Sequence, residues 1–181
     1  MHRSLSTRGR FFIAAIAFAL ISLLLALFVP LTYSETKYFE LDVAHWHIPF
    51  KNYVLFASAL GCIILLLIVL GMKRHISTYI LATCLGVAAL FIGYMSFLSL
   101  TTIDEEAIYI KDVFDEHTYY WHDMTNITLL YDEQDFSEQY IITLADGSTV
   151  HIDKTAQFEQ ASSFIYSTAR ANDIPFQEER K

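Results

Sequence analysis

The histidines are the residues whose type and spacing come nearest to a chemical site. His45 and His47 are separated by one residue, so in an extended segment both imidazoles point to the same side. Imidazole binds zinc or copper, and His117, His122 and His151 lie further along the chain. The spacing of these five residues matches no known ligand set, and isolated histidines are usually surface or packing residues. A metal site at these positions is therefore kept as an alternative hypothesis.

Carboxylates are the second group that could carry chemistry. They cluster in Asp104-Glu105-Glu106 and in Asp132-Glu133-x-Asp135, but neither spacing matches a calcium-binding EF-hand loop. Charge runs of this kind usually form the solvated face of a turn. The sequence also lacks a phosphate-binding loop, a dinucleotide fingerprint and a Gly-x-Ser-x-Gly motif. These observations predict a protein that is not an enzyme, with no catalytic residues and no cofactor.

The charges divide the chain into two halves. Residues 1–100 contain seven Lys/Arg and three Asp/Glu, whereas residues 101–181 contain five Lys/Arg and seventeen Asp/Glu, a net charge of −12. Such an acidic half repels nucleic acids and anionic headgroups, so it favours a basic protein, a peptide or a metal cation. The chain is 54% apolar, with a mean hydropathy of +0.37, which exceeds the needs of a soluble core of this size.

The excess apolar residues lie in three long runs that predict three transmembrane helices, at residues 11–31, 53–72 and 76–100. Each run is long enough to cross about 30 Å of hydrocarbon at about 1.5 Å per residue. We expect Pro30 to mark the outer end of the first helix. A cleaved signal peptide is the alternative for this run, but its length and the absence of a small-x-small cleavage site favour a retained anchor.

The positive charges near the helix ends predict the orientation. Arg3, Arg8 and Arg10 precede the first helix, and Lys73-Arg74 joins the second helix to the third. Both clusters should face the cytoplasm of a cell membrane, which places residues 34–52 and everything after Thr101 outside.

The composition of the three runs bears on their function and packing. None contains Asp, Glu, Lys, Arg or His, which disfavours a transport function for this chain alone. Ala57-x-x-x-Gly61 is a pattern that permits close approach of helices. We expect it to pack inside the three-helix bundle, with homodimerisation as the alternative.

The loop at residues 34–52 is rich in aromatic residues. Trp and Tyr settle at headgroup depth, so the loop should lie along the membrane surface or pack under the C-terminal domain, with Pro49 stopping any helix there. If the loop instead forms an aromatic patch for a partner, the candidate contact residues are Tyr38, Phe39, Trp46 and Phe50.

The C-terminal half, residues 101–181, has the periodicity of short antiparallel strands followed by a helix. Alternation of two predicts five strands, at 107–113, 117–121, 126–131, 140–144 and 149–152. The last two should form a hairpin, because Asp146-Gly147 tolerates positive φ. An amphipathic helix should begin near Asp153 or Thr155 and end near Asn172, and residues 177–181 should be frayed.

Five strands closed by a C-terminal helix form the element order of a pleckstrin-homology-like (PH-like) domain. The segments Ala107-Ile-Tyr-Ile-Lys111, Tyr119-Tyr-Trp-His-Asp-Met124 and Ile141-Ile-Thr-Leu-Ala-Asp-Gly-Ser-Thr-Val150 resemble the small PH-like domains of bacterial membrane proteins of unassigned function. The resemblance covers residues 104–174 and implies an α+β domain, shortened from the seven strands of a complete PH domain. It does not extend to lipid binding, because no basic phosphoinositide pocket is visible.

These observations together predict a membrane-anchored accessory or scaffold protein that presents an acidic PH-like domain to another membrane or extracytoplasmic protein. In the domain, the candidate contact residues are Tyr119, Tyr120 and Trp121. The alternative is an extracytoplasmic metal or ligand sensor that uses the five histidines.

Overall fold

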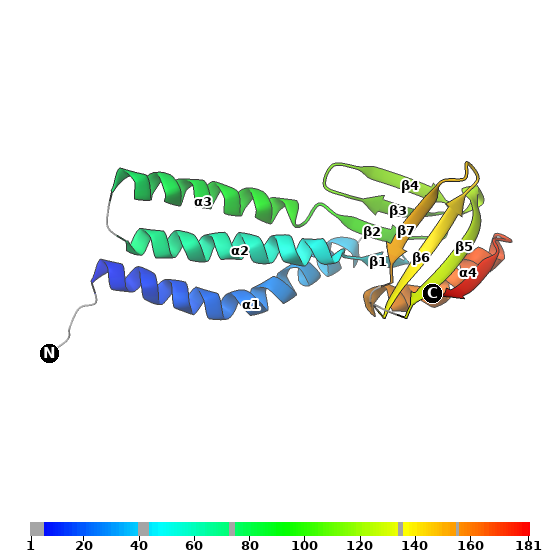
Figure 1. Ribbon diagram of the computed structural model, residues 1–181, viewed down its shortest axis with the longest axis horizontal. Coiled ribbons are helices and arrows are strands. Elements are labelled where there is room, and N and C mark those ends of the chain that lie inside the picture. The colour runs from blue at the N-terminus through cyan, green and yellow to red at the C-terminus, as the bar shows by residue number, and fades with distance from the viewer. Residues whose placement is uncertain (1–5, 40–43, 73–74, 134–135, 155) are drawn as a thin grey trace. The chain divides into compact units, whose positions relative to one another are not determined.

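The computed structural model describes residues 6–39, 44–72, 75–133, 136–154 and 156–181. Within these residues the chain forms four α-helices, one 3-10 helix and eight strands (Figure 1). Contacts divide the chain into a helical unit, residues 1–40 and 48–99, and a sheet domain, residues 41–47 and 100–181. The boundary expected at residue 100 is therefore not the whole division, because residues 41–47, between the first two helices, also belong to the sheet domain.

The first helix is longer than its apolar run. Helix α1 spans Thr7–Phe39, with Pro30 inside it rather than at its end. Proline removes one backbone hydrogen bond, and helices in apolar surroundings tolerate this loss when neighbouring groups satisfy the freed carbonyl groups. The carbonyl group that loses its partner at Pro30 is that of Ala26. One turn beyond the proline, Ser34 Oγ donates to the Pro30 carbonyl oxygen at 3.0 Å, which adds a side-chain bond to the helix but does not replace the lost one. The expected loop at residues 34–52 is wrong over its first part, which is helical.

Helices α2 (Phe50–Gly71) and α3 (Ile76–Met95) complete the helical unit, and α2 packs against both α1 and α3 (Figure 1). Pro49 does not prevent a helix but precedes α2 as its N-cap. Helix α3 ends five residues before the predicted position 100, and the chain turns at Ser96–Leu98. The apolar run continues past Met95 through this turn to Leu100, the first residue of a strand, and a short apolar stretch does not distinguish these elements.

One close approach between α2 and α3 involves Gly93 of α3 and Ala59 of α2, and not Gly61. A Cβ atom placed on Gly93 would lie 3.7 Å from the Ala59 Cβ atom, whereas one placed on Gly61 would meet no atom within 4 Å. The expectation that Ala57-x-x-x-Gly61 packs inside the bundle is thus wrong for Gly61.

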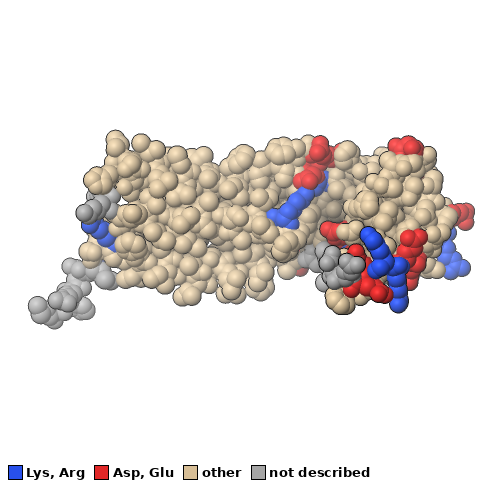
Figure 2. All heavy atoms as spheres, in the orientation of Figure 1, with Lys and Arg blue, Asp and Glu red and all other residues tan. Residues whose placement is uncertain are grey.

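The three helices have the length and composition of membrane spans. Among the described residues, each helix contains an 18-residue stretch of high mean hydropathy. The value is 3.0 in Thr7–Lys37, 2.9 in Phe50–Gly71 and 2.0 in Ile76–Met95. In Figure 2 the helical unit is almost without charged side chains over most of its length, while Asp and Glu side chains gather on the sheet domain. These helices fit a multi-pass membrane protein.

The sheet domain contains two four-stranded sheets instead of the single antiparallel sheet that was expected. The first, in the order β1-β2-β3-β4, is antiparallel and consists of His45–His47, Leu100–Ile103, Ala107–Lys111 and Glu116–Tyr120. The 3-10 helix η1 (Trp121–Asp123) then leads into the second sheet.

The second sheet has the order β7-β6-β5-β8. Strands β5 (Met124–Asp132), β6 (Ser137–Leu144) and β7 (Thr149–Asp153) are antiparallel, which confirms the predicted hairpin. Gly147 has φ +82°, and the Asp146 carboxylate accepts hydrogen bonds from the Ser148 amide and hydroxyl groups at 2.8 and 2.6 Å. These bonds lower the pKa of Asp146, with the bond from the hydroxyl group as the main cause.

Helix α4 (Ala156–Ala171) confirms the predicted amphipathic helix, but the segment after it is not frayed. Asp173 has φ +56°, and the Ile174 amide donates to the Ala169 carbonyl oxygen at 2.9 Å, as in a Schellman C-cap. This turn directs the chain into strand β8 (Phe176–Arg180), which pairs parallel with β5. The sequence of β8 does not alternate between apolar and polar residues and therefore did not predict a strand, because only its first side chain, Phe176, is partly buried.

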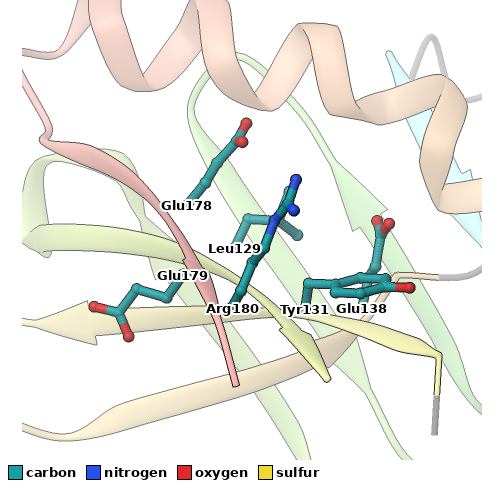
Figure 3. Close-up of a pocket in the computed structure, with 6 residues that line it drawn as sticks. All are labelled: Leu129, Tyr131, Glu138, Glu178, Glu179 and Arg180. Carbon is teal, nitrogen blue, oxygen red and sulfur yellow. The ribbon is translucent and has the colours of Figure 1, made fainter. Parts of the chain in front are cut away.

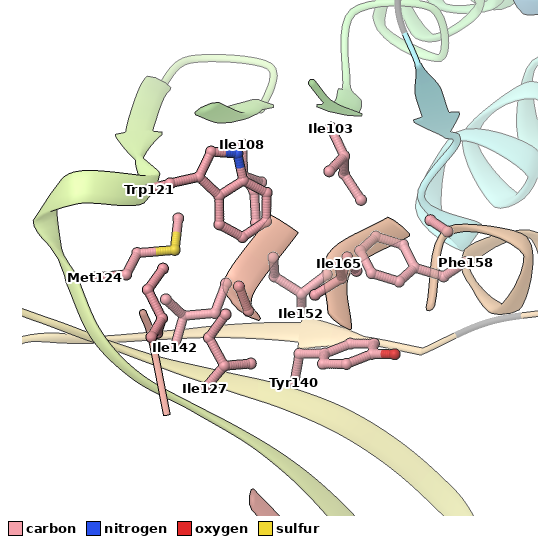
Figure 4. Packing of buried hydrophobic residues seen from close by; sticks show 13 residues of the cluster. Ile103, Ile108, Trp121, Met124, Ile127, Tyr140, Ile142, Ile152, Phe158 and Ile165 are labelled. Atoms are coloured by element: carbon pink, nitrogen blue, oxygen red, sulfur yellow. The ribbon is translucent and has the colours of Figure 1, made fainter. Parts of the chain in front are cut away.

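The core lies between the two sheets and α4 (Figure 4). Ile103 and Ile108 from the first sheet, Ile127 and Ile142 from the second, and Ile165 from α4 are each at most 2% exposed. Burial of an aliphatic side chain of this size stabilises a fold by about 1.5–3 kcal/mol. These residues join both sheets and α4 in one apolar core.

Candidate functional site

The seven aromatic residues predicted to contact a partner have different surroundings in the structure. Trp121 lies in the core (Figure 4) and is 1% exposed. Its Nε1 donates to the Asp104 carbonyl oxygen at 2.8 Å. Tyr119 packs against the same core, and burial raises the pKa of its hydroxyl group. Trp121 is therefore a structural residue and not a contact residue.

The other candidates divide between the two units. Phe50 is 75% exposed at the first position of α2, in the helical unit. The side chains of Tyr38 and Phe39 lie outside the part of the chain that the structure describes. Tyr120 is 45% exposed on β4, and Trp46 is half-buried on β1, so the sheet domain retains two of its candidates at its surface.

The first sheet has a core face and an opposite face, which we call the aromatic face. Its register joins Trp46 to Thr102, Thr102 to Tyr109 and Tyr109 to Thr118, and side chains in one cross-strand row share a face. Ile103 and Ile108 point to the core, so this row points away from it. The aromatic face consists of Trp46, Tyr109, Tyr120 and, stacked on Tyr120 with ring centroids 5.3 Å apart, His122.

One carboxylate is held beside this face. Glu116 accepts a hydrogen bond from the Tyr109 hydroxyl group, and its Oε2 lies 3.4 Å from Lys111 Nζ. The hydrogen bond from Tyr109, followed by the interaction with Lys111, lowers the pKa of Glu116, so this residue is ionised at neutral pH.

Strand β4 is the edge of the sheet that carries the aromatic face. The Asp112 amide donates to the Asp115 carbonyl oxygen at 2.7 Å, and the Trp121 amide donates to the Glu106 carbonyl oxygen at 3.3 Å. Hydrogen-bonded pairs alternate along an antiparallel ladder, so His117 and Tyr119 also bond to β3. The N–H and C=O groups of Glu116, Thr118 and Tyr120 therefore point away from β3, at the edge of the sheet.

The five histidines are not brought together. His45 and His47 share a face of β1, as predicted, but they pack edge-on against Phe164 and Phe158 of α4, at 5.2 and 5.6 Å between ring centroids. Among the described residues, no three His, Cys, Asp or Glu side chains form a group that could hold a metal ion. His117 lies on β4, His122 lies in the 3-10 helix η1, and His151 lies on β7.

Two residues next to β4 were missed by the sequence analysis. Tyr109 lies in the predicted strand at 107–113, where the alternation of two puts it on the face opposite Ile108 and Ile110. Phe114 is 85% exposed at the turn between β3 and β4. The sequence signal for Phe114 is an aromatic residue in a turn between two acidic residues, Asp112 and Asp115, where an exposed ring is expected.

A hollow of about 300 Å³ opens at the other sheet, lined by Leu129, Tyr131, Glu138, Glu178, Glu179 and Arg180 (Figure 3). Lys154 pairs with Glu138 beside it, and the hydrogen bond to that carboxylate is the main cause that raises the pKa of Lys154. The ion pair joins the start of β6 to the residue after β7. Since the lining carries three carboxylates and one guanidinium group, the hollow does not suit an anion.

Comparison with protein-family models, with curated proteins and with solved structures finds no match to this chain. The fold therefore defines only a general class of protein, with three helices of membrane-spanning length and composition and a sheet domain.

Proposed function

We propose that this chain is a non-enzymatic accessory or scaffold protein of a cell membrane, whose acidic domain binds a protein partner through the aromatic face. The observation that carries the proposal is the exposed edge and aromatic face of the β1–β4 sheet, on a domain with a large negative charge and three apolar helices in the same chain. Aromatic residues are enriched at the centres of protein interfaces because they bury a large area at low entropic cost.

Insertion of the three helices into a bilayer is supported by what their surfaces expose. Leu20 and Leu23 of α1 are 74% and 70% exposed, and Leu90 of α3 is 78% exposed. Large apolar side chains are unfavourable in water but suit hydrocarbon. Arg8 and Arg10 at the start of α1, Arg3 ahead of them in the sequence, and the basic pair between α2 and α3 favour cytoplasmic positions for both ends, which puts the sheet domain outside the cell.

The sheet domain is a candidate PH-like domain. Among the described residues, seven strands precede α4 along the chain, four in the first sheet and three in the second, and the helix then follows; this order supports a PH-like domain, although the resemblance itself implied five strands in one sheet. Strands β1 and β2 lie before residues 104–174, which the resemblance covers, and would bring the number of strands to the seven of a complete PH domain. Strand β8 is an addition after the helix. The acidic surface favours a protein ligand over an anionic lipid.

A photo-crosslinking experiment in intact membranes tests the partner surface. Tyr120 is replaced by a photoreactive phenylalanine, and Tyr166 of α4, 51% exposed, is replaced in the same way as the matched control. We expect Tyr120, but not Tyr166, to form a crosslinked species with another protein that also copurifies with the tagged chain. Equal crosslinking from both positions, or no copurifying protein, would contradict the proposal.

A further inference from the structure

Strand β4 is the most exposed edge of either sheet that carries little charge of its own. Of its five residues, Glu116, His117, Thr118 and Tyr120 are exposed and Tyr119 is partly buried. Edge strands are usually protected by lysine, proline, a bulge or very short length. Strand β4 has five residues, no lysine, no proline and a regular register with β3.

The other edges are less suitable for an added strand. Strand β1 has only three residues, and β8 carries Glu178, Glu179 and Arg180. Strand β7 also has five residues, but none of them is Phe, Tyr or Trp, so its edge has no aromatic side chain of this kind beside it. Among the described strands, β4 alone combines an exposed, weakly charged edge with the aromatic face beside it.

The charges around β4 select the occupant. Asp112 and Asp115 lie in the turn before the strand. Asp104, Glu105 and Glu106 lie in the turn between β2 and β3, where the Glu106 carbonyl oxygen accepts a hydrogen bond from the amide of Trp121, the residue directly after β4. Together with Glu116 these are six carboxylates, while Lys111 is the basic residue next to them in the β3–β4 hairpin. A second copy of β4 would bring six more carboxylates to the same place, so self-pairing is electrostatically unfavourable.

We propose that β4 accepts a basic, extended segment of a partner protein as an additional strand of the β1–β4 sheet. The backbone groups of Glu116, Thr118 and Tyr120 supply the pairing, and arginine or lysine side chains of the added strand lie beside Glu116 and over the Tyr120 ring. Five residues at about 3.3 Å each give an edge of roughly 17 Å, so five or six residues of the partner suffice. This inference deepens the proposed function and rests on it.

The test uses the full chain in detergent micelles and a fluorescent nine-residue peptide of alternating arginine and valine. The matched peptide has glutamate in place of arginine. In an antiparallel pairing, the residues opposite Glu116, Thr118 and Tyr120 place their side chains on the aromatic face and also make the backbone bonds, so the arginines should make these bonds. We expect the arginine peptide to bind, the glutamate peptide not to bind, and N-methylation of the central arginines to weaken binding about tenfold or more, while N-methylation of the valines has little effect.

Two variants extend the test to the protein. Thr118→Pro removes an outward N–H group and should weaken binding of the arginine peptide about tenfold or more. Thr149→Pro makes the corresponding change at β7 and should leave binding unchanged. In case Thr118→Pro fails to fold, Glu116→Lys provides the second measurement and should also weaken binding of the arginine peptide.

The result that would overturn strand addition is binding of the arginine peptide that tolerates N-methylation at every position, because the contact would then be only electrostatic. Absence of binding would overturn it equally. Disulfide formation between two copies of a Thr118→Cys variant would identify a second copy as the occupant and would also contradict the proposal. Crosslinking from Tyr120 to a partner protein in the absence of peptide binding would leave the proposed function intact and remove only this mode of binding.

Discussion

The side chain of Trp121 shows how a single residue organises the sheet domain. It follows directly after β4, packs in the core, and bonds through Nε1 to the Asp104 carbonyl oxygen. The residue before it, Tyr120, points to the aromatic face. Consecutive residues of one sequence motif thus have opposite roles, and the period of two assigns them once a single buried residue is known.

The backbone conformation at position 147 favours glycine over any other residue. A β-carbon at φ +82° is strained, so Gly147→Ala should lower the free energy of unfolding by about 1–2 kcal/mol. Gly147→Asn should cost less, because asparagine adopts positive φ more readily. Urea unfolding in micelles, followed by tryptophan fluorescence, measures this, since both tryptophans of the chain, Trp46 and Trp121, lie in the sheet domain. Equal stability of the two variants would contradict the account of the turn.

The ion pair between Lys154 and Glu138 should give the domain a dependence on alkaline pH. The folded state raises the pKa of Lys154 above its ordinary 10.5, so the pair stabilises the fold fully below that pH and loses its contribution as the pH rises above the folded pKa. The difference in unfolding free energy between the natural chain and Glu138→Gln should therefore shrink at pH values above about 10.5. A difference that stays constant up to pH 12 would show that the pair is not the cause.

At the scale of elements, strong periodicity predicted most of the sheet domain. The five expected strands correspond to β3–β7, the hairpin turn at Asp146-Gly147 is confirmed, and so is α4. Strand β1 was missed because three residues carry too little pattern, and β2 because its apolar residues continue the run of α3. The edge position of β4 could not be predicted either, since the order of strands in a sheet depends on contacts distant in sequence.

Strand β8 tests the account of the C-terminal segment. Phe176 packs edge-on against Tyr166 and Tyr140, with ring centroids 5.4 and 6.4 Å apart. Phe176→Ala should lower the unfolding free energy by about 1–3 kcal/mol, less than for a fully buried ring. Gln177→Ala, whose side chain is exposed on the opposite face, should change it by no more than about 0.5 kcal/mol. Similar effects of both changes would show that β8 does not belong to the core.

The helix packing predicts a second contrast between two glycines. Gly93 faces Ala59 across the α2–α3 contact, so Gly93→Leu should separate these helices and lower the temperature at which the purified chain aggregates in detergent. Gly61→Leu meets open space and should leave that temperature close to its natural value. A larger fall in the aggregation temperature for Gly61→Leu than for Gly93→Leu would show that α2 packs through the face that carries Gly61 and would contradict this account.

At the scale of the whole molecule, the proposed function depends on where charge and apolar surface are found along the chain. The helical unit carries the three apolar helices, and residues 101–181 carry seventeen of the twenty acidic residues. This distribution, unlike the edge of β4, was readable from the sequence, because composition needs no knowledge of contacts. An acidic domain outside the cell and basic segments inside it are the arrangement that the positive charges favour.

Labelling of single cysteines in intact cells tests this arrangement most directly. With Cys62 and Cys84 replaced by alanine, Ala145→Cys introduces a thiol at the exposed β6–β7 turn, and Thr7→Cys introduces one at the start of α1. The account predicts that a membrane-impermeant maleimide labels the cysteine at position 145 in intact cells and the one at position 7 only after permeabilisation. Labelling at position 7 with protection of position 145 would place the domain in the cytoplasm and contradict the proposed orientation.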